Sequence, residues 1–323
     1  MEKKRTTKGT KRTIFLFLLI LAVLYVVIYV VPQVSDIFVE TYSAEYGTLQ
    51  IKEETDCLFV RTEKTYTAPF GGAVNRVISR GKLMRTSARI VDVGQTACYS
   101  DMRGIVSYYY DGLEGVYTPE NMQTITEADL ELTDEEKQTY AVRECSQGTV
   151  ESGSPIFKIV DNKEWYLVCW LSAAEAEDIE AGRSITVEFD DGKQLKMKVM
   201  QVNPQGQNRQ LILSCNRYYE KFDSIRSGTC RLIKSSKSGI IVDSDSIVEE
   251  DGQKGVYVMS KQLDEASFVP VKVLLSHGDK TVVEKNYFIN VEGQKVSTVE
   301  NYDEILKKPP TAEEAEGSEK NAD

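Results

Sequence analysis

The pattern of hydrophobic and polar positions divides the chain into one long apolar run and a series of short alternating runs. The long run covers residues 14–31 and contains no charged or amide side chain. After it, short segments rich in Val, Ile, Tyr and Thr are separated by Gly, Asn, Asp and Pro, which is the spacing of strands and turns. The chain beyond the run is therefore predicted to be mainly β.

The apolar run is predicted to be a single transmembrane helix. At 1.5 Å per residue it would extend about 27 Å, close to the roughly 30 Å hydrocarbon core of a bilayer. Residues 1–13 contain six Lys or Arg side chains and only one carboxylate, so the positive-inside rule predicts a cytoplasmic basic tail. We therefore expect a single-pass protein of the cell membrane, with the bulk of the chain outside the cytoplasm.

A cleaved signal peptide is the alternative to this signal anchor. Signal peptides have an apolar core of about 7–15 residues and end in small residues at the cleavage site. Here the run is longer and is followed by VPQVSDIF. These two features favour the uncleaved anchor.

Short helices are predicted at two capping boxes. Ser172 and Glu175 have the spacing of such a box, which predicts a helix over residues 173–181. Thr133 and Glu136 repeat the spacing within an acidic segment, where a helix would form a solvated face.

Turn residues also predict how the strands are divided. The Asp-Asp-Gly-Lys sequence at residues 190–193 predicts a tight hairpin that joins strands 184–189 and 195–202. Other short strands are expected at residues 49–51, 58–61, 230–233 and 239–242.

Three segments resemble, in this order, the HlyD-type membrane-fusion or periplasmic adaptor family. The first, TYTAPFGGAVNRVISRGKLMRTSARIVDV at residues 65–93, is similar to half of a lipoyl-like β-hammerhead, and residues 104–115 with 147–160 resemble the other half. Residues 162–189 are similar to the β-barrel domain of the family. Residues 255–258 and 268–273 resemble its membrane-proximal β-domain.

The resemblance implies a serial arrangement of domains after the anchor. The expected parts are a split lipoyl-like domain (45–161) with an insertion (116–144), a β-barrel domain (162–235) and a membrane-proximal β-domain (236–306). Residues 307–323 are rich in charged residues and contain two prolines, which predicts a disordered tail.

The chain departs from adaptors that reach an outer-membrane channel. In those proteins a long helical hairpin separates the lipoyl halves, whereas only residues 94–103 lie between them here. The resemblance implies a non-enzymatic, extracytoplasmic subunit of an efflux or secretion complex. Its partner would be a transporter of the ABC or a similar type in the same membrane, and a homo-oligomer is plausible. An envelope scaffold of cell-wall or division machinery is the alternative, since it needs no hairpin.

The sequence offers no candidate catalytic, cofactor-binding or metal-binding residues. The whole chain carries a net charge of −11 although its first segment is basic, so the outer part is too acidic for a nucleic-acid partner. His277 is the one histidine and lies in a predicted turn without a nucleophile motif. Lys196 and Lys198 flank Met197 in a predicted barrel strand, not at the hairpin tip that a lipoyl or biotinyl lysine needs.

The six cysteines have no C-x-x-C spacing, which argues against a structural zinc site or a thioredoxin-type centre. They are Cys57, Cys98, Cys145, Cys169, Cys215 and Cys230. Six cysteines allow 15 disulfide pairings, and the spacing does not choose among them. Cys169 alternates with large apolar residues in a predicted strand, which favours a buried free thiol.

Overall fold

The computed structural model describes residues 40–260 and 266–308, together with residues 17, 19–21, 24 and 25. Strands dominate the described residues, so the prediction of a mainly β chain is confirmed. They form two compact units. The first contains residues 50–235, and the second combines the segments before residue 50 and after residue 235.

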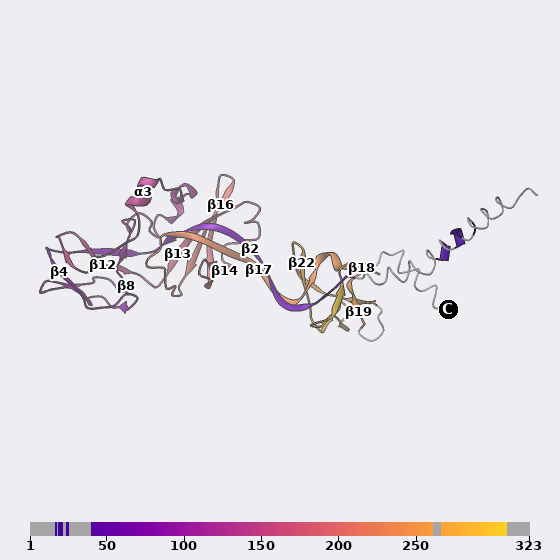
Figure 1. Ribbon diagram of the computed structural model, residues 1–323. Coiled ribbons are helices and arrows are strands. Elements are labelled where there is room, and N and C mark those ends of the chain that lie inside the picture. Colours follow the sequence, from indigo (N-terminus) through magenta and orange to yellow (C-terminus); the bar gives the residue numbers. More distant parts are fainter. Residues whose placement is uncertain (1–16, 18, 22–23, 26–39, 261–265, 309–323) are drawn as a thin grey trace, which may run out of the picture. The chain divides into compact units, whose positions relative to one another are not determined.

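A closed β-barrel forms one half of the first unit (Figure 1). Its strands follow one another around the ring in the order β14–β15–β16–β13–β2–β17, and β17 pairs with β14 to close it. The bounds are β2 (Glu45–Val60), β13 (Trp165–Ser172), β14 (Ser184–Phe189), β15 (Gln194–Gln205), β16 (Asn208–Cys215) and β17 (Ser227–Asp243). The hairpin predicted at residues 190–193 connects β14 and β15, and Gly192 adopts the expected positive φ of 78°.

Two barrel strands are much longer than the sequence predicts. The strands expected at residues 49–51 and 58–61 belong to β2, and those expected at 230–233 and 239–242 belong to β17. Polar residues in the middle of each segment predict an interruption of the strand. The two strands nevertheless pair with each other and remain extended through these residues. Residues 45–60, which were expected to begin the lipoyl-like domain, form β2 and pair within the barrel sheet.

A sandwich of two small sheets forms the other half of the first unit (Figure 1). One sheet contains β3 (Glu63–Thr67), β12 (Pro155–Val160), β8 (Gly104–Ser107) and β5 (Leu83–Met84). The other contains β11 (Thr149–Val150), β4 (Gly72–Arg76), β6 (Arg89–Val93) and β7 (Thr96–Tyr99). Gly94 and Gln95 alone connect β6 to β7. A tight turn therefore follows the first lipoyl-like segment (residues 65–93), where the adaptors that reach an outer-membrane channel have a long helical hairpin.

The segment expected as an insertion follows the short strand β9 (Tyr109–Tyr110) and ends at its partner β10 (Arg143–Glu144). It contains η3 (Met122–Thr124), η4 (Glu127–Leu130) and α3 (Asp134–Thr139). The capping box of Thr133 and Glu136 forms as predicted and begins α3, which is solvent-exposed. This segment is inserted in the sequence of the sandwich domain, but it packs on the outside of the barrel. Its buried residues Tyr117 and Ile125 lie in one cluster with Leu58, Val168 and Trp170 of the barrel wall.

This packing explains an unusual pattern in the barrel strands. In β13, Leu167 and Cys169 point into the barrel core, whereas Val168 and Trp170 point out beneath the insertion. The strand is therefore buried on both faces, and its sequence is apolar almost throughout instead of alternating.

The helix predicted over residues 173–181 is absent. The capping contacts form, since the Glu175 carboxylate accepts from the Ser172 amide (2.9 Å) and the Ser172 hydroxyl accepts from the Glu175 amide (3.3 Å). The backbone nevertheless continues as turns. Ala176 and Ile179 are buried in the barrel core, and so short a segment has little helical stability of its own, so tertiary packing decides its path.

The second unit is a small β-domain around its own apolar core. Its main sheet contains β1 (Thr41–Ser43), β25 (Glu304–Leu306), β19 (Gln253–Met259), β18 (Val248–Glu250) and β20 (Ala266–Pro270). β22 (Lys280–Val283) pairs with the end of β17, and β21 (Val273–His277) pairs with β22. The short helix η5 (Ser244–Ser246) follows β17 in the chain. β23 (Tyr287–Ile289) and β24 (Lys295–Ser297) form a separate hairpin. Figure 1 shows β18, β19 and β22 in this unit.

Most of the predicted transmembrane run lies outside the described residues, as do the basic tail and residues 309–323 of the predicted disordered tail. The described members of the run are helical, with exposed apolar side chains. They are Phe17, Leu19, Ile20, Leu21, Leu24 and Tyr25. In the part of the chain that the structure describes, no helix is both long and apolar enough to cross a bilayer.

Candidate functional site: the joint between sandwich and barrel

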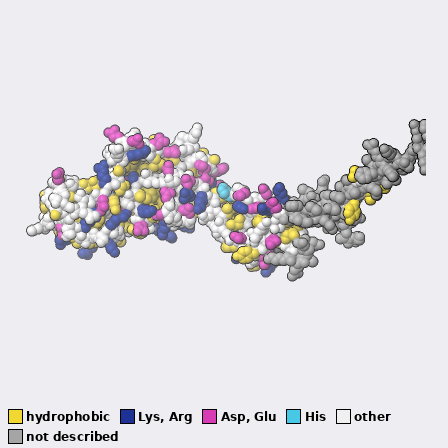
Figure 2. Space-filling view, viewed as in Figure 1, with side chains coloured by type: hydrophobic (Ala, Val, Ile, Leu, Met, Phe, Trp, Pro, Cys, Tyr) yellow, Lys and Arg dark blue, Asp and Glu magenta, His cyan; other side chains and the backbone are white. Residues whose placement is uncertain are grey.

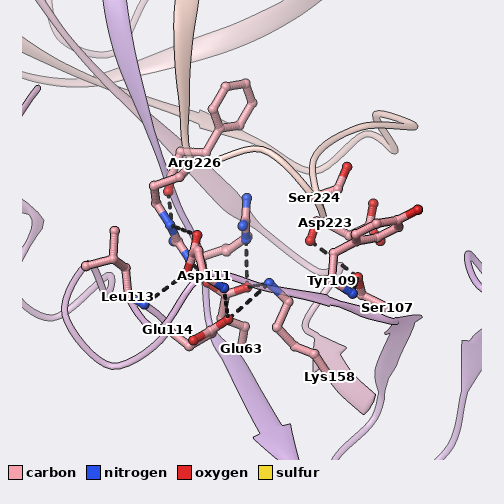
Figure 3. Close-up of polar contacts among 12 residues, drawn as sticks. Glu63, Ser107, Tyr109, Asp111, Leu113, Glu114, Lys158, Asp223, Ser224 and Arg226 are labelled. Atoms are coloured by element: carbon pink, nitrogen blue, oxygen red, sulfur yellow. Dashed lines mark hydrogen bonds and ion pairs between the residues drawn. The ribbon is translucent and has the colours of Figure 1, made fainter. Parts of the chain in front are cut away.

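A buried network of charged side chains joins the sandwich to the barrel (Figure 3). The sandwich supplies Glu63 from β3 and Lys158 from β12, and Arg226 comes from the residue before β17 of the barrel. Asp111 and Glu114 come from the start of the insertion. These five side chains thus connect three parts of the chain that are far apart in sequence.

Glu63 is the centre of the network. Its carboxylate contacts three cations: Arg61 through Nε at 2.9 Å, Lys158 through Nζ at 2.8 Å, and Arg226 in a close ion pair. The Glu63, Arg61 and Lys158 side chains are at most 1% exposed. A buried carboxylate is costly unless opposite charges and hydrogen bonds surround it, and here it has both.

The insertion completes the charge balance. Asp111 forms a bidentate pair with Arg226, at 2.8 Å from Nε and 3.0 Å from Nη2. Its Oδ1 also accepts from the backbone amide of Leu113 at 2.9 Å. Glu114 lies 3.6 Å from the Lys158 ammonium and accepts from the backbone amides of Asp111 and Gly112. Three acids therefore face three cations.

Arg61 extends the network to the barrel. Its Nη1 donates to the carbonyl oxygens of Phe222 and Ile225, which precede β17. Near this segment, Arg80 of the sandwich forms a bidentate pair with Asp223 at 2.8 and 3.0 Å. Bidentate arginine pairs fix orientation as well as distance, so these contacts set how the sandwich meets the barrel.

The electrostatics favour the charged forms of both acids at the centre. Burial alone would raise the pKa of Glu63, but Arg61, Arg226 and Lys158 outweigh it and hold this pKa well below its usual range. The pKa of Asp111 is lowered in the same way, with burial opposed by Arg226. The pKa of Arg226 is raised, because Glu63 and Asp111 outweigh the effect of its burial.

The arrangement is suited to holding two domains together. Each of these charges has an opposite partner within the network. The described residues also contain no group of His, Cys, Asp or Glu that could hold a metal ion. The ion pairs and hydrogen bonds of the joint connect the two domains.

The histidine, lysine and cysteine residues that were considered as candidate functional residues from the sequence are not members of this network. His277 is exposed at the end of β21, and Lys196 and Lys198 are exposed on β15. All six cysteines are free. Burial raises the pKa of Cys169, and the thiol of Cys57 has its pKa raised by its hydrogen bond to Cys230 together with burial, so these thiols stay protonated.

Sequence reasoning missed the joint, although one signal was present. Lys158 lies in the middle of the apolar strand sequence PIFKIV. A lysine flanked by buried apolar residues on both sides needs a buried counter-charge, which would have directed the search to Glu63.

Two family models match the chain over the parts that the joint connects. Residues 63–161 match an RND-related barrel-sandwich hybrid domain, which corresponds to the expected lipoyl-like domain. Residues 165–236 match an RND-related β-barrel domain. Together they cover more than half of the chain. No curated protein sequence matches it.

Solved structures with similar folds include those of the following three proteins. ZneB from Cupriavidus metallidurans is 10% identical with a TM-score of 0.27, over 84% of this chain and 93% of its own. MacA from Actinobacillus actinomycetemcomitans is 10% identical with a TM-score of 0.33, over 84% and 100%. A putative efflux transporter from Bacteroides eggerthii is 12% identical with a TM-score of 0.33, over 74% and 87%.

These structures superpose poorly on the whole chain. The family of the chain is therefore given by the two domain matches and their order. A sandwich split by an insertion is followed directly by a closed barrel, as the resemblance implies. The chain therefore belongs, over residues 63–161 and 165–236, to the RND-related barrel-sandwich hybrid and β-barrel domain families.

Proposed function

We propose that this protein is a non-enzymatic adaptor subunit of an export complex, anchored in the cell membrane by residues 14–31 and coupled to a transporter there. The observation that carries the proposal is the joint, where Glu63, Arg61, Lys158, Arg226 and Asp111 fasten the sandwich to the barrel. An adaptor must transmit position between partners, and a fixed connection between its domains serves that purpose.

The insertion supports the same role. Gln205 and Gln210 of the barrel both donate to the carbonyl oxygen of Ile125, at 3.0 and 2.7 Å. Asn208 donates to the Glu127 carboxylate at 2.7 Å. The insertion is thus a second connection between the domains, made of apolar and polar contacts outside the ion network.

The short turn at Gly94 and Gln95 limits the reach of the complex. Two residues cannot supply the long helical hairpin with which other adaptors approach an outer-membrane channel. An adaptor of this kind suits export across one membrane.

The chain has sheet edges and exposed aromatic side chains for partner contacts. Among the described strands, β7 pairs with β6 alone, and Tyr99 at its end is 56% exposed. Basic and acidic side chains are mixed over both units on the face that Figure 2 shows. We propose that edges of this kind contact the transporter and further copies of the chain.

Crosslinking in membranes tests the proposal. A photo-crosslinking amino acid replaces Tyr99 in the full chain, and Tyr302 of the second unit, 62% exposed, serves as the matched position. Adducts with a transporter subunit are expected from at least one position, accompanied by adducts between copies. Recovery of monomer alone, or of cell-wall or division proteins in place of a transporter, would overturn the export role.

A further inference from the structure

The hairpin of β23 and β24 presents exposed apolar side chains to solvent in the described structure. Tyr287 and Ile289 alternate along β23, so their side chains share one face, and Val291 follows in the turn of the same hairpin. Their exposed fractions are 48%, 51% and 105%. Exposed apolar residues gathered on one small element indicate an interaction site.

The opposite face and the turn hold the hairpin in a defined shape. Phe288 is 9% exposed and pairs with Val296 on the side that faces the domain. In the turn, the Asn290 side chain accepts from the backbone amides of Glu292 (3.1 Å) and Gln294 (2.8 Å). The apolar face is therefore presented by an ordered element.

A lysine lies at the edge of the apolar face. Lys295 pairs with Ile289 across the hairpin, and its ammonium lies 4.0 Å from the centre of the Tyr287 ring. Tyrosine and lysine beside apolar side chains are the residues that proteins use at a membrane surface, because each has an apolar body and a polar end.

The chain itself brings this unit close to a membrane. The unit begins its described structure at Glu40, and only residues 32–39 separate it from the apolar run. Nine residue steps at full extension span at most about 30 Å. If residues 14–31 cross the bilayer, as the proposed function requires, the hairpin unit is held within reach of the lipid headgroups.

We propose that the β23–β24 hairpin is a membrane-surface contact that lies in the lipid headgroup layer beside the anchor. Its apolar face enters the boundary between headgroups and acyl chains, and Lys295 binds lipid phosphate. Glu292 in the turn sets the depth, because a carboxylate is costly to bury in hydrocarbon. The hairpin would hold the second unit at the membrane surface.

Fluorescence quenching by brominated lipids tests this contact in the full chain. Val291→Trp is reconstituted in phosphatidylcholine liposomes that contain no other protein, with bromines at different acyl-chain depths. Val142→Trp, at an exposed valine of the first unit, is the matched control. Each variant is compared with the unmodified chain, whose tryptophans Trp165 and Trp170 are buried in the barrel region.

Additional quenching is expected for Val291→Trp alone, and it should be strongest with bromines near the headgroups, because interfacial elements enter only about 5–10 Å. Equal quenching of the two variants would overturn the proposal, and a hairpin that binds a protein partner instead would give that result. Flotation of the same liposomes tests the anchor separately. A chain that floats without quenching at residue 291 refutes the hairpin contact, whereas a chain that does not float refutes the anchor.

Discussion

At the residue scale, the carboxylate of Glu63 is buried and depends on its cationic neighbours for compensation. It is a carboxylate buried among three cations, and its neighbours come from both domains. Such a network adds little stability relative to a well-packed apolar core, but removing one member leaves buried charges without a partner.

Glu63→Gln is expected to lower the free energy of unfolding by about 3–5 kcal/mol, because Arg61, Lys158 and Arg226 lose their shared counter-charge. Urea unfolding followed by the fluorescence of the two tryptophans measures this. Glu54→Gln, which removes a mostly exposed partner of Arg231, is the control and should change stability little. Equal effects of the two variants would contradict a structural role for the joint.

The same carboxylates predict how stability depends on pH. The pKa values of Glu63 and Asp111 are lowered in the folded chain, so their contribution is complete above the usual carboxylate range and is lost as the pH falls below that range toward the lowered values. Urea midpoints should differ little between about pH 7 and 5 and should decrease from about pH 5 to 3. The decrease should be smaller for Glu63→Gln. A variant that follows the same pH profile as the original chain would show that Glu63 does not contribute.

At the element scale, close strand packing fixes the sandwich. Gly104 begins β8, and a Cβ atom there would lie 2.4 Å from the carbonyl oxygen of Val160 on the neighbouring β12. Backbone atoms cannot move aside as a flexible side chain can. A glycine is therefore required at this position for steric reasons.

Gly104→Ala is expected to destabilise the sandwich by about 1–3 kcal/mol through overpacking. Gly148→Ala is the matched control, since a Cβ atom there meets nothing within 4 Å and the backbone is not left-handed. Thermal unfolding of both variants distinguishes a steric requirement from a general effect of alanine. Similar melting temperatures would contradict the close approach of β8 and β12.

The insertion is held to the barrel by Ile125, which is 4% exposed. Ile125→Asp should release residues 116–144 from the barrel wall, because a carboxylate cannot remain in that apolar cluster. Limited proteolysis should then cut within the insertion, and Trp170 beneath it should show red-shifted emission. Val142→Asp, at a 45% exposed position, should leave the insertion as resistant as before. Resistance of both variants would mean that other contacts hold the insertion.

At the scale of the whole molecule, charge asymmetry predicts the orientation in the membrane. In intact cells stripped of their wall, external protease should remove the part after residue 40 and leave an epitope tag before residue 14 protected. Replacing the six basic residues of the tail by serine should reduce that protection. Replacing Lys307 and Lys308 should not. Digestion of the tag in the unaltered chain would reverse the proposed topology.

Local sequence patterns determined the mainly β class, the hairpin at residues 190–193 and the helix cap at Thr133, because each depends on a few neighbouring residues. The resemblance to the adaptor family also implied a lipoyl-like segment followed by a barrel segment, and the two domain matches occur in that order. Only the tertiary structure decided that β2 and β17 are single long strands and that residues 173–181 remain non-helical. It also placed the insertion on the barrel and brought Glu63, Lys158 and Arg226 together. These outcomes depend on contacts between distant segments, whose energies outweigh the local preferences that a sequence pattern records.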